Sequence, residues 1–138
     1  MKRKDARKEL MSLCFEYSFR PDVDPQLIYS QALETRLATD EDYIRNSFFG
    51  IISNLEFIDG KISEFSNGWK LQRISPVALA TMRTAVYEIW FCDDVPDTVA
   101  INEAVEIVRE FDDEKKMRPF VNGVLNAVMK SKPQADGE

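Results

Sequence analysis

The sequence of 138 residues contains no histidine, only two cysteines, five glycines and six prolines. The absence of histidine excludes imidazole general-base catalysis, Ser-His and Cys-His nucleophile pairs, and every metal site that needs a histidine ligand. The cysteines Cys14 and Cys92 lie within apolar helical patterns and cannot form a Cys-rich zinc site by themselves. We therefore expect buried, reduced thiols, as in a reducing compartment. The low glycine and proline content excludes collagen and low-complexity disorder.

Long apolar segments are also missing. The basic start MKRKDARKEL is followed by mixed apolar and polar residues and not by the continuous apolar segment of a signal peptide. No stretch approaches the roughly 18 apolar residues that would span a bilayer. We therefore expect a cytoplasmic protein that does not bind membranes. Hydrophobic residues make up 44% of the chain, which suits one globular domain that folds without metals or disulfides.

Charge is distributed unevenly along the chain. Residues 1–8 carry five cations and one acid, and residues 115–132 carry five cations and no acid. Since the net charge of the chain is −6, the remaining residues carry −15. The acidic total argues against indiscriminate coating of nucleic acid, but a local basic face can bind phosphates if the two basic segments meet in the fold. The alternative is two solvated helix ends with ordinary surface lysines.

Apolar residues recur at helical spacing nearly everywhere, and no segment alternates in the manner of a strand, so the fold class is predicted to be all-α. We expect about seven helices joined by short turns, in one domain over residues 1–132 with a frayed tail at 133–138. Gly123, inside the last helix, predicts the close approach of a neighbouring helix. The expected helices lie at about 3–19, from Pro25 to about Leu37, from a cap at Thr39 to Asp59-Gly60, around Ile62 and Phe65 up to Asn67-Gly68, from Pro76 to about Phe91, around Ile101–Val108, and around Met117–Val128 with Pro119 in the first turn.

The sequence contains no recognisable catalytic motif. It has no Gly-rich phosphate loop, metal-ligand cluster or nucleophile-base spacing. The acid pairs Asp93-Asp94 and Asp112-Asp113 lie at predicted turns or helix starts, where carboxylates cap helices and are solvated. We therefore expect no enzymatic activity, no catalytic residue, no metal and no cofactor.

The segment from Arg83 to Lys130, RTAVYEIWFCDDVPDTVAINEAVEIVREFDDEKKMRPFVNGVLNAVMK, resembles the NusB family of bacterial transcription antitermination factors. Its most specific pieces are DVPDTVAINEAVEIVREF and FVNGVLNAV, and the basic start KRKDARKELMSLCFEYSF and the segment WKLQRI match more weakly. The resemblance implies two small helical bundles packed together. It also implies binding of the single-stranded boxA element of nascent RNA together with NusE, a ribosomal small-subunit protein. Their complex acts on RNA polymerase to suppress termination, notably in ribosomal RNA operons.

Single-stranded RNA is held by cations along its backbone and by aromatic side chains that stack on its bases. The first helix supplies four cations, and by resemblance Phe15 takes a position where the family often has Tyr, while Phe120 is the aromatic of the FVNG motif. Core packing is the alternative for both phenylalanines, and we expect Trp69, Trp90 and Phe91 to be core or partner-surface residues. The predicted RNA-binding residues are Arg3, Lys4, Arg7, Lys8, Phe15, Lys116, Arg118 and Phe120.

The chain departs from the family pattern at two places. Ala78 lies in a neighbourhood where the family commonly carries an acid, so the resemblance supports the NusE contact less strongly than the RNA contact. Lys115 and Lys116 stand where acidic or small polar residues are usual. The net charge of −6 and Ala78 favour an alternative, a helical protein-interaction module without RNA binding. A third reading, a NusB-like domain of a ribosomal RNA cytosine methyltransferase, is disfavoured because the chain shows no Cys-containing active-site motif and no room for the catalytic domain. Whether the protein is a monomer or a homodimer stays open.

Overall fold

The computed structural model describes residues 1–37 and 40–133, and over these residues the chain forms helices and no strand. This confirms the all-α fold class. The predicted cap Thr39 and residues 134–138 of the predicted tail lie outside the described residues. The helices are α1 (Arg3–Phe19), α2 (Pro25–Thr35), α3 (Asp42–Ser53), α4 (Leu55–Glu64), the 3-10 helix η1 (Leu71–Arg73), α5 (Pro76–Phe91), α6 (Asp97–Phe111) and α7 (Met117–Lys130).

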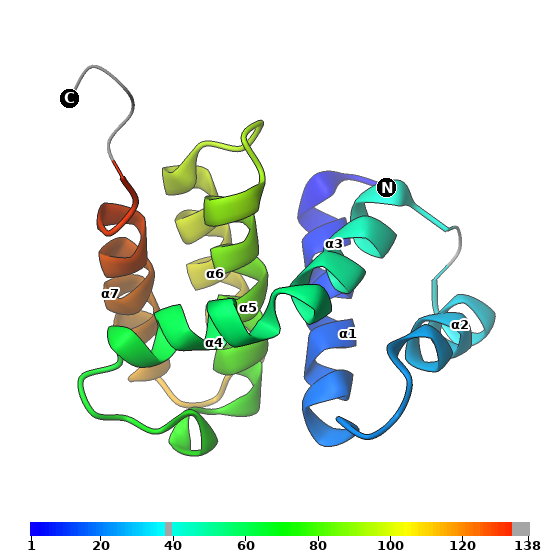
Figure 1. The fold of residues 1–138 in the computed structure, drawn as a ribbon, viewed down its shortest axis with the longest axis horizontal. Coiled ribbons are helices and arrows are strands. Elements are labelled where there is room, and N and C mark those ends of the chain that lie inside the picture. Colours follow the sequence, from blue (N-terminus) through cyan, green and yellow to red (C-terminus); the bar gives the residue numbers. More distant parts are fainter. Residues whose placement is uncertain (38–39, 134–138) are drawn as a thin grey trace.

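The helices are arranged as two bundles that pack against each other. Figure 1 shows α1, α2 and α3 on one side of the molecule, and α4, α5, α6 and α7 on the other. The helices α3 and α4 follow each other across the middle of the view and link the two bundles, with Asn54 as the residue between them. The two-bundle arrangement agrees with the resemblance.

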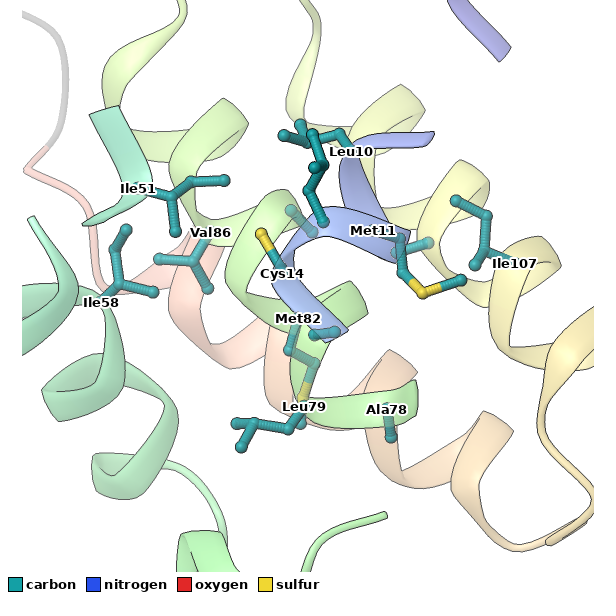
Figure 2. Packing of buried hydrophobic residues seen from close by; sticks show 14 of the residues in the cluster. Leu10, Met11, Cys14, Ile51, Ile58, Ala78, Leu79, Met82, Val86 and Ile107 are labelled. Atoms are coloured by element: carbon teal, nitrogen blue, oxygen red, sulfur yellow. The ribbon is translucent and has the colours of Figure 1, made fainter. Parts of the chain in front are cut away.

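Helix α5 lies at the centre of the core. Eleven of its sixteen residues are buried, and its apolar side chains meet those of α1, as Figure 2 shows for Met82 and Val86 near Leu10 and Cys14. Each fully buried side chain of this size contributes about 1.5–3 kcal/mol relative to exposure. This shared core joins the bundles and fixes α1 relative to the helices of the second bundle.

Local signals at helix starts agree with the structure. The carboxylate of Asp24 accepts a hydrogen bond from the backbone N–H of Gln26 at 2.9 Å, and Pro25 takes the first position of α2. The hydroxyl of Ser75 accepts one from the N–H of Ala78 at 3.1 Å, with Pro76 at the start of α5. These caps satisfy N–H groups that have no partner within the helix.

The predicted helix end at Asp59-Gly60 is wrong. The chain breaks instead at Asn54, whose side-chain amide donates to the carbonyl of Gly50 at 2.8 Å, and α4 continues through Asp59 and Gly60. Asparagine competes with the backbone for such carbonyls, whereas a single glycine in a helix costs only about 1 kcal/mol. The fully buried Ile58 then anchors α4 in the core.

The predicted close approach at Gly123 is also wrong. No heavy atom lies within 4 Å of the position that a Cβ would take there. The close approach occurs at Gly50 of α3, where the Cε1 and Cζ atoms of Tyr87 would lie 2.7 Å from an added Cβ. Gly50 therefore allows α3 and α5 to pack closely.

Candidate nucleic-acid interface

Arg7, one of the four predicted cations of α1, is buried in an ion pair with Glu88 of α5. Its Nε and Nη2 atoms donate to the two carboxylate oxygens at 3.0 and 3.1 Å, and the side chains of Arg7 and Glu88 are only 10% and 3% exposed. Burial lowers the pKa of the guanidinium, but the hydrogen bonds and charge of Glu88 outweigh it and leave that pKa raised. Arg7 thus holds α1 against α5 and does not present its charge to solvent.

Lys4 and Lys8 lie on the side of α1 that faces α6. The Nζ of Lys4 is 3.7 Å from the carboxylate of Glu103, and the Nζ of Lys8 is 2.9 Å from that of Glu110. The hydrogen bond to Glu110 raises the pKa of Lys8. These four side chains help to line a shallow depression of about 300 Å³. Both lysines can reach a ligand there, but their charges are partly neutralised by α6.

Arg3 stacks on an aromatic ring of the neighbouring helix α3. Its guanidinium carbon lies 4.0 Å from the ring centroid of Tyr43, a cation–π contact. Arg3 is exposed, and no carboxylate pairs with it among the residues that the structure describes. It is the cation of the predicted α1 set with the least compensated charge.

Phe15 is half-buried near the other end of α1. Its ring packs against the core and meets the ring of Phe19 edge to face, with centroids 5.0 Å apart. Phe19 is 62% exposed. The ring of Phe15 therefore contributes to core packing, and Phe19 provides most of the exposed aromatic surface at this end of α1.

Phe120 and Lys116 meet at the start of α7, where they contact Trp69. The rings of Trp69 and Phe120 have centroids 5.5 Å apart, tilted by 46°. The Nζ of Lys116 lies 5.3 Å from the ring centroid of Trp69 and 3.9 Å from the carboxylate of Glu114. Pro119 occupies the first turn of α7, as predicted. Arg118, next to it, is half-buried.

The eight predicted residues form two groups by their contacts, which we call the α1 group (Arg3, Lys4, Arg7, Lys8 and Phe15) and the α7 corner (Lys116, Arg118 and Phe120). The cations of the α1 group contact α3, α5 and α6. Lys116 and Phe120 contact Trp69, in the loop after α4. Lys132, from the second basic segment, instead binds Asp97 at 3.0 Å and the carbonyl of Ile89 at 2.8 Å.

Three residues beside the α7 corner were missing from the predicted site: Trp69, Lys70 and Arg73. All three are exposed. A signal for them exists in the segment WKLQR, which places an aromatic and two cations directly after the turn-forming pair Asn67-Gly68. Both turn residues have positive φ, 52° and 85°.

The described residues contain no group of three or more acidic or thiol side chains arranged to hold a metal ion. Within the same residues, every helix is too short or too polar to cross a membrane. Cys14 and Cys92 are free thiols, one buried and one half-buried.

The fold and surface define an all-helical, two-bundle protein with clustered cations and aromatic rings. The model of the NusB family matches residues 4–130, and the chain belongs to this family. It is 41% identical over 139 residues to a protein named transcription antitermination protein NusB of Acetivibrio thermocellus, covering 99% of this chain and 95% of that one. It is 35% identical over 128 residues to the protein of that name from Bacillus cereus, covering 93% and 97%.

Solved structures share the fold. T. maritima NusB superposes with a TM-score of 0.85 and 32% identity, over 95% of this chain and 92% of that one. A structure of the antitermination factors NusB and NusE in complex with dsRNA gives a TM-score of 0.82 over 94% and 97% of the two chains. At 23% identity, this second likeness concerns the fold alone.

Proposed function

We propose that this protein is a transcription antitermination factor that binds boxA-type single-stranded RNA together with NusE. The complex acts on RNA polymerase in the cytoplasm, notably during transcription of ribosomal RNA, and the protein catalyses no reaction. The observation that carries the proposal is the 41% identity, over nearly the full length of both chains, to a protein named for transcription antitermination. A protein that shares this fold was solved as NusB in complex with NusE and dsRNA, and we take NusE and RNA as partners of this chain as part of the proposal.

RNA contact is proposed at the surface cations and rings of both groups. Arg3, Lys4 and Lys8 supply charge from α1, and Lys116 supplies charge beside the ring of Phe120 at the α7 corner. Phosphate contacts position the strand, and aromatic rings stack on its bases. Arg7 is a positioning residue in this scheme, because its guanidinium is occupied by Glu88.

The contact with NusE is proposed at a groove of about 350 Å³ between the two bundles. Phe19, which is 62% exposed, lines it together with Leu71 and Leu79. Exposed aromatic residues are common in the centre of protein interfaces. Ala78 does not weaken this proposal, because it is fully buried and an uncharged residue there removes no charge from the surface.

A binding titration tests the function. The protein is titrated against boxA-type RNA and against the same RNA in scrambled order, each with and without NusE. We expect tighter binding of the boxA-type RNA and a further gain when NusE is present. Binding of NusE without binding of either RNA would instead support the helical protein-interaction module.

A further inference from the structure

We propose that the exposed aromatic rings where α4 meets the end of α5 bind a basic segment of a further protein, in which arginine side chains stand next to apolar ones. This surface, which we call the aromatic patch, consists of Phe57, Tyr87, Trp90 and Phe91. None of these residues belongs to the proposed contacts with RNA or NusE. The inference therefore adds a partner surface to the proposed function.

Phe57 of α4 and Phe91, the last residue of α5, form the exposed part of the patch. They are 40% and 42% exposed, and their ring centroids lie 5.8 Å apart. Within the described part of the chain, no other two exposed rings contact each other. Single apolar residues are normal on a protein surface, whereas adjoining ones are typical of an interaction site.

The rings beneath hold this surface in place. Trp90 meets Phe57 edge to face at 5.1 Å, and Tyr87 stacks on Phe91 at 5.4 Å with an interplanar angle of 25°. The ring of Tyr87 lies against Gly50 of α3, where its Cζ atom would be 2.7 Å from an added Cβ. Because these contacts order the rings before any ligand binds, binding loses little side-chain entropy.

The patch already holds one cation of the chain itself. The Nζ of Lys61 lies 5.0 Å from the ring centroid of Trp90 and 5.8 Å from that of Phe57, both cation–π contacts. The charge of Lys61 is balanced by Glu64, whose carboxylate is 3.5 Å away. The exposed parts of the Phe57 and Phe91 rings remain open to a cation of a partner.

Three carboxylates lie beside the exposed rings. They belong to Glu56, which precedes Phe57, and to Asp93 and Asp94, which follow closely after Phe91. All three residues are exposed, and none of them pairs with a cation among the residues that the structure describes. Arginine complements both features, because its planar guanidinium binds carboxylates through two hydrogen bonds and also stacks on aromatic rings.

The same carboxylates disfavour other occupants of the patch. They would repel the phosphates of an RNA strand. In a symmetric dimer the same surface of both copies meets itself, so a second copy would bring carboxylates against carboxylates, and like charges across an interface are unfavourable. A basic protein segment meets neither obstacle.

The patch lies at the opposite end of α5 from the groove proposed for NusE. That groove is lined by Pro76 and Leu79 at the start of the helix. Helix α5 has 16 residues, which gives it a length of about 24 Å. Figure 1 shows the connection before α5 at the lower end of the second bundle and the connection after α5 at its upper end. The further protein and NusE can therefore bind at the same time.

A synthetic peptide tests the patch. The probe is an amidated peptide of four Arg-Leu-Gly repeats, and the matched control peptide has Glu-Leu-Gly repeats. In the variant Trp69→Phe, Trp90 is the single tryptophan, and its emission should change to saturation with the arginine peptide only. In an NMR titration with this peptide, shifted backbone amides should cluster at residues 56–61 and 87–94, the two segments that build the patch.

A variant tests the aromatic contribution. Phe91→Ala should weaken binding of the arginine peptide about 2- to 30-fold, the effect of one lost cation–π contact. The control Leu27→Ala removes another exposed apolar side chain, from α2, and should leave the affinity unchanged. Urea unfolding checks that both variants are folded.

A second pair of variants tests the carboxylates. Asp93→Asn/Asp94→Asn should weaken binding of the arginine peptide and flatten its dependence on salt, because the removed charges attract the guanidinium groups. The matched control Asp22→Asn/Glu34→Gln removes the same charge at exposed positions in and beside α2 and should retain most of the affinity.

Several results would overturn the inference. Absence of saturable binding, amide shifts spread over the acidic surface, or equal losses for the patch variants and their controls would leave only unspecific attraction. Self-association that Phe91→Ala abolishes would make a second copy the occupant, and weaker binding of boxA-type RNA to Phe91→Ala would assign the patch to the RNA site. The titrations with boxA-type RNA and NusE test the proposed function separately, so either proposal can fail while the other stands.

Discussion

At the scale of single residues, Arg7 of α1 and Glu88 of α5 form a buried, bidentate ion pair. Both side chains lie between α1 and α5, and the hydroxyl of Tyr43 also donates to Glu88 at 3.4 Å. Removing two charges from water is costly, and the cost is offset only while both partners remain. The pair therefore fixes the orientation of α1 relative to α5.

Replacement of Arg7 by Met should lower the free energy of unfolding by about 3–5 kcal/mol, because it leaves the carboxylate of Glu88 buried without a partner. The double variant Arg7→Met/Glu88→Leu should recover most of this loss. Urea unfolding followed by circular dichroism measures both values. The control Lys4→Met, whose side chain is 61% exposed, should change the stability by less than about 1 kcal/mol. An equally small loss for Arg7→Met would contradict the structural role.

The two thiols should be unreactive at neutral pH. Burial raises the pKa of Cys14 to about 12, and burial followed by the charges of Glu88 and Asp94 raises that of Cys92 to about 11, both above the ordinary value of 9.0. Since the thiolate is the nucleophile, iodoacetamide should modify neither at neutral pH in the folded protein. Modification of Cys92 should accelerate as the pH approaches 11, and Cys14 should react only after unfolding. Mass spectrometry follows both, with urea-unfolded protein as the control. Rapid labelling of native Cys92 at neutral pH would disprove the raised pKa.

At the scale of helices, α6 restrains the cations of α1. Glu103 and Glu110 on α6 pair with Lys4 and Lys8, so in the proposed RNA contact a phosphate has to replace a carboxylate at each lysine. A surface ion pair of this kind is worth at most about 1 kcal/mol, which makes the replacement feasible. We therefore expect the carboxylates of Glu103 and Glu110 to lower the affinity for RNA at the proposed α1 contact.

Glu110→Gln should therefore tighten RNA binding, by up to about fivefold, the equivalent of about 1 kcal/mol. The gain should be largest at low salt, because the removed carboxylate also repels phosphate. The matched control is Glu16→Gln, which breaks the pair of Glu16 with Arg20 near the other end of α1 and removes the same charge. Titrations at several salt concentrations compare the two variants. Equal affinities would show that Lys8 does not contact RNA.

Helix ends were predictable where the signal is local. The starts of α2 and α5 follow from Asp24-Pro25 and Ser75-Pro76, since a cap and a proline act within one turn. The break at Asn54 was missed, because Asp59-Gly60 is an equally good stop signal in the sequence. The hydrogen bond from Asn54 to the carbonyl of Gly50 and the burial of Ile58 in the core decide between them.

For the candidate site, too, the sequence predicts the local features but not the contacts between distant residues. Composition identified the cations of α1, but the partners of those cations could not be predicted, because Glu88 lies 81 positions from Arg7. The close approach at Gly50 depends in the same way on Tyr87, a residue of another helix. The sequence predicts Trp69 as a core or partner-surface residue, because nothing in its own segment shows that Phe120 covers only part of the ring.

At the scale of the whole molecule, the core runs through both bundles. Helix α5 packs against α1 and α3 of the first bundle as well as α4, α6 and α7 of the second. Figure 2 shows side chains of α1, α3, α4, α5 and α6 in one continuous cluster. Because neither bundle has a separate core, we expect them to unfold together, and the two groups of proposed RNA contacts to stay in a fixed relation.

Phe48→Ala tests this coupling. Phe48 is fully buried in the first bundle, where its ring packs against Phe49 with centroids 5.3 Å apart, and its loss should cost about 3–5 kcal/mol. In a Trp69→Phe background, the fluorescence of Trp90 reports on the second bundle, while far-UV circular dichroism reports on all helices. In a two-state transition both probes should shift to the same lower urea midpoint. A Trp90 midpoint that stays in place while the helical signal is lost earlier would mean that the bundles unfold separately, and the shared core would not join them.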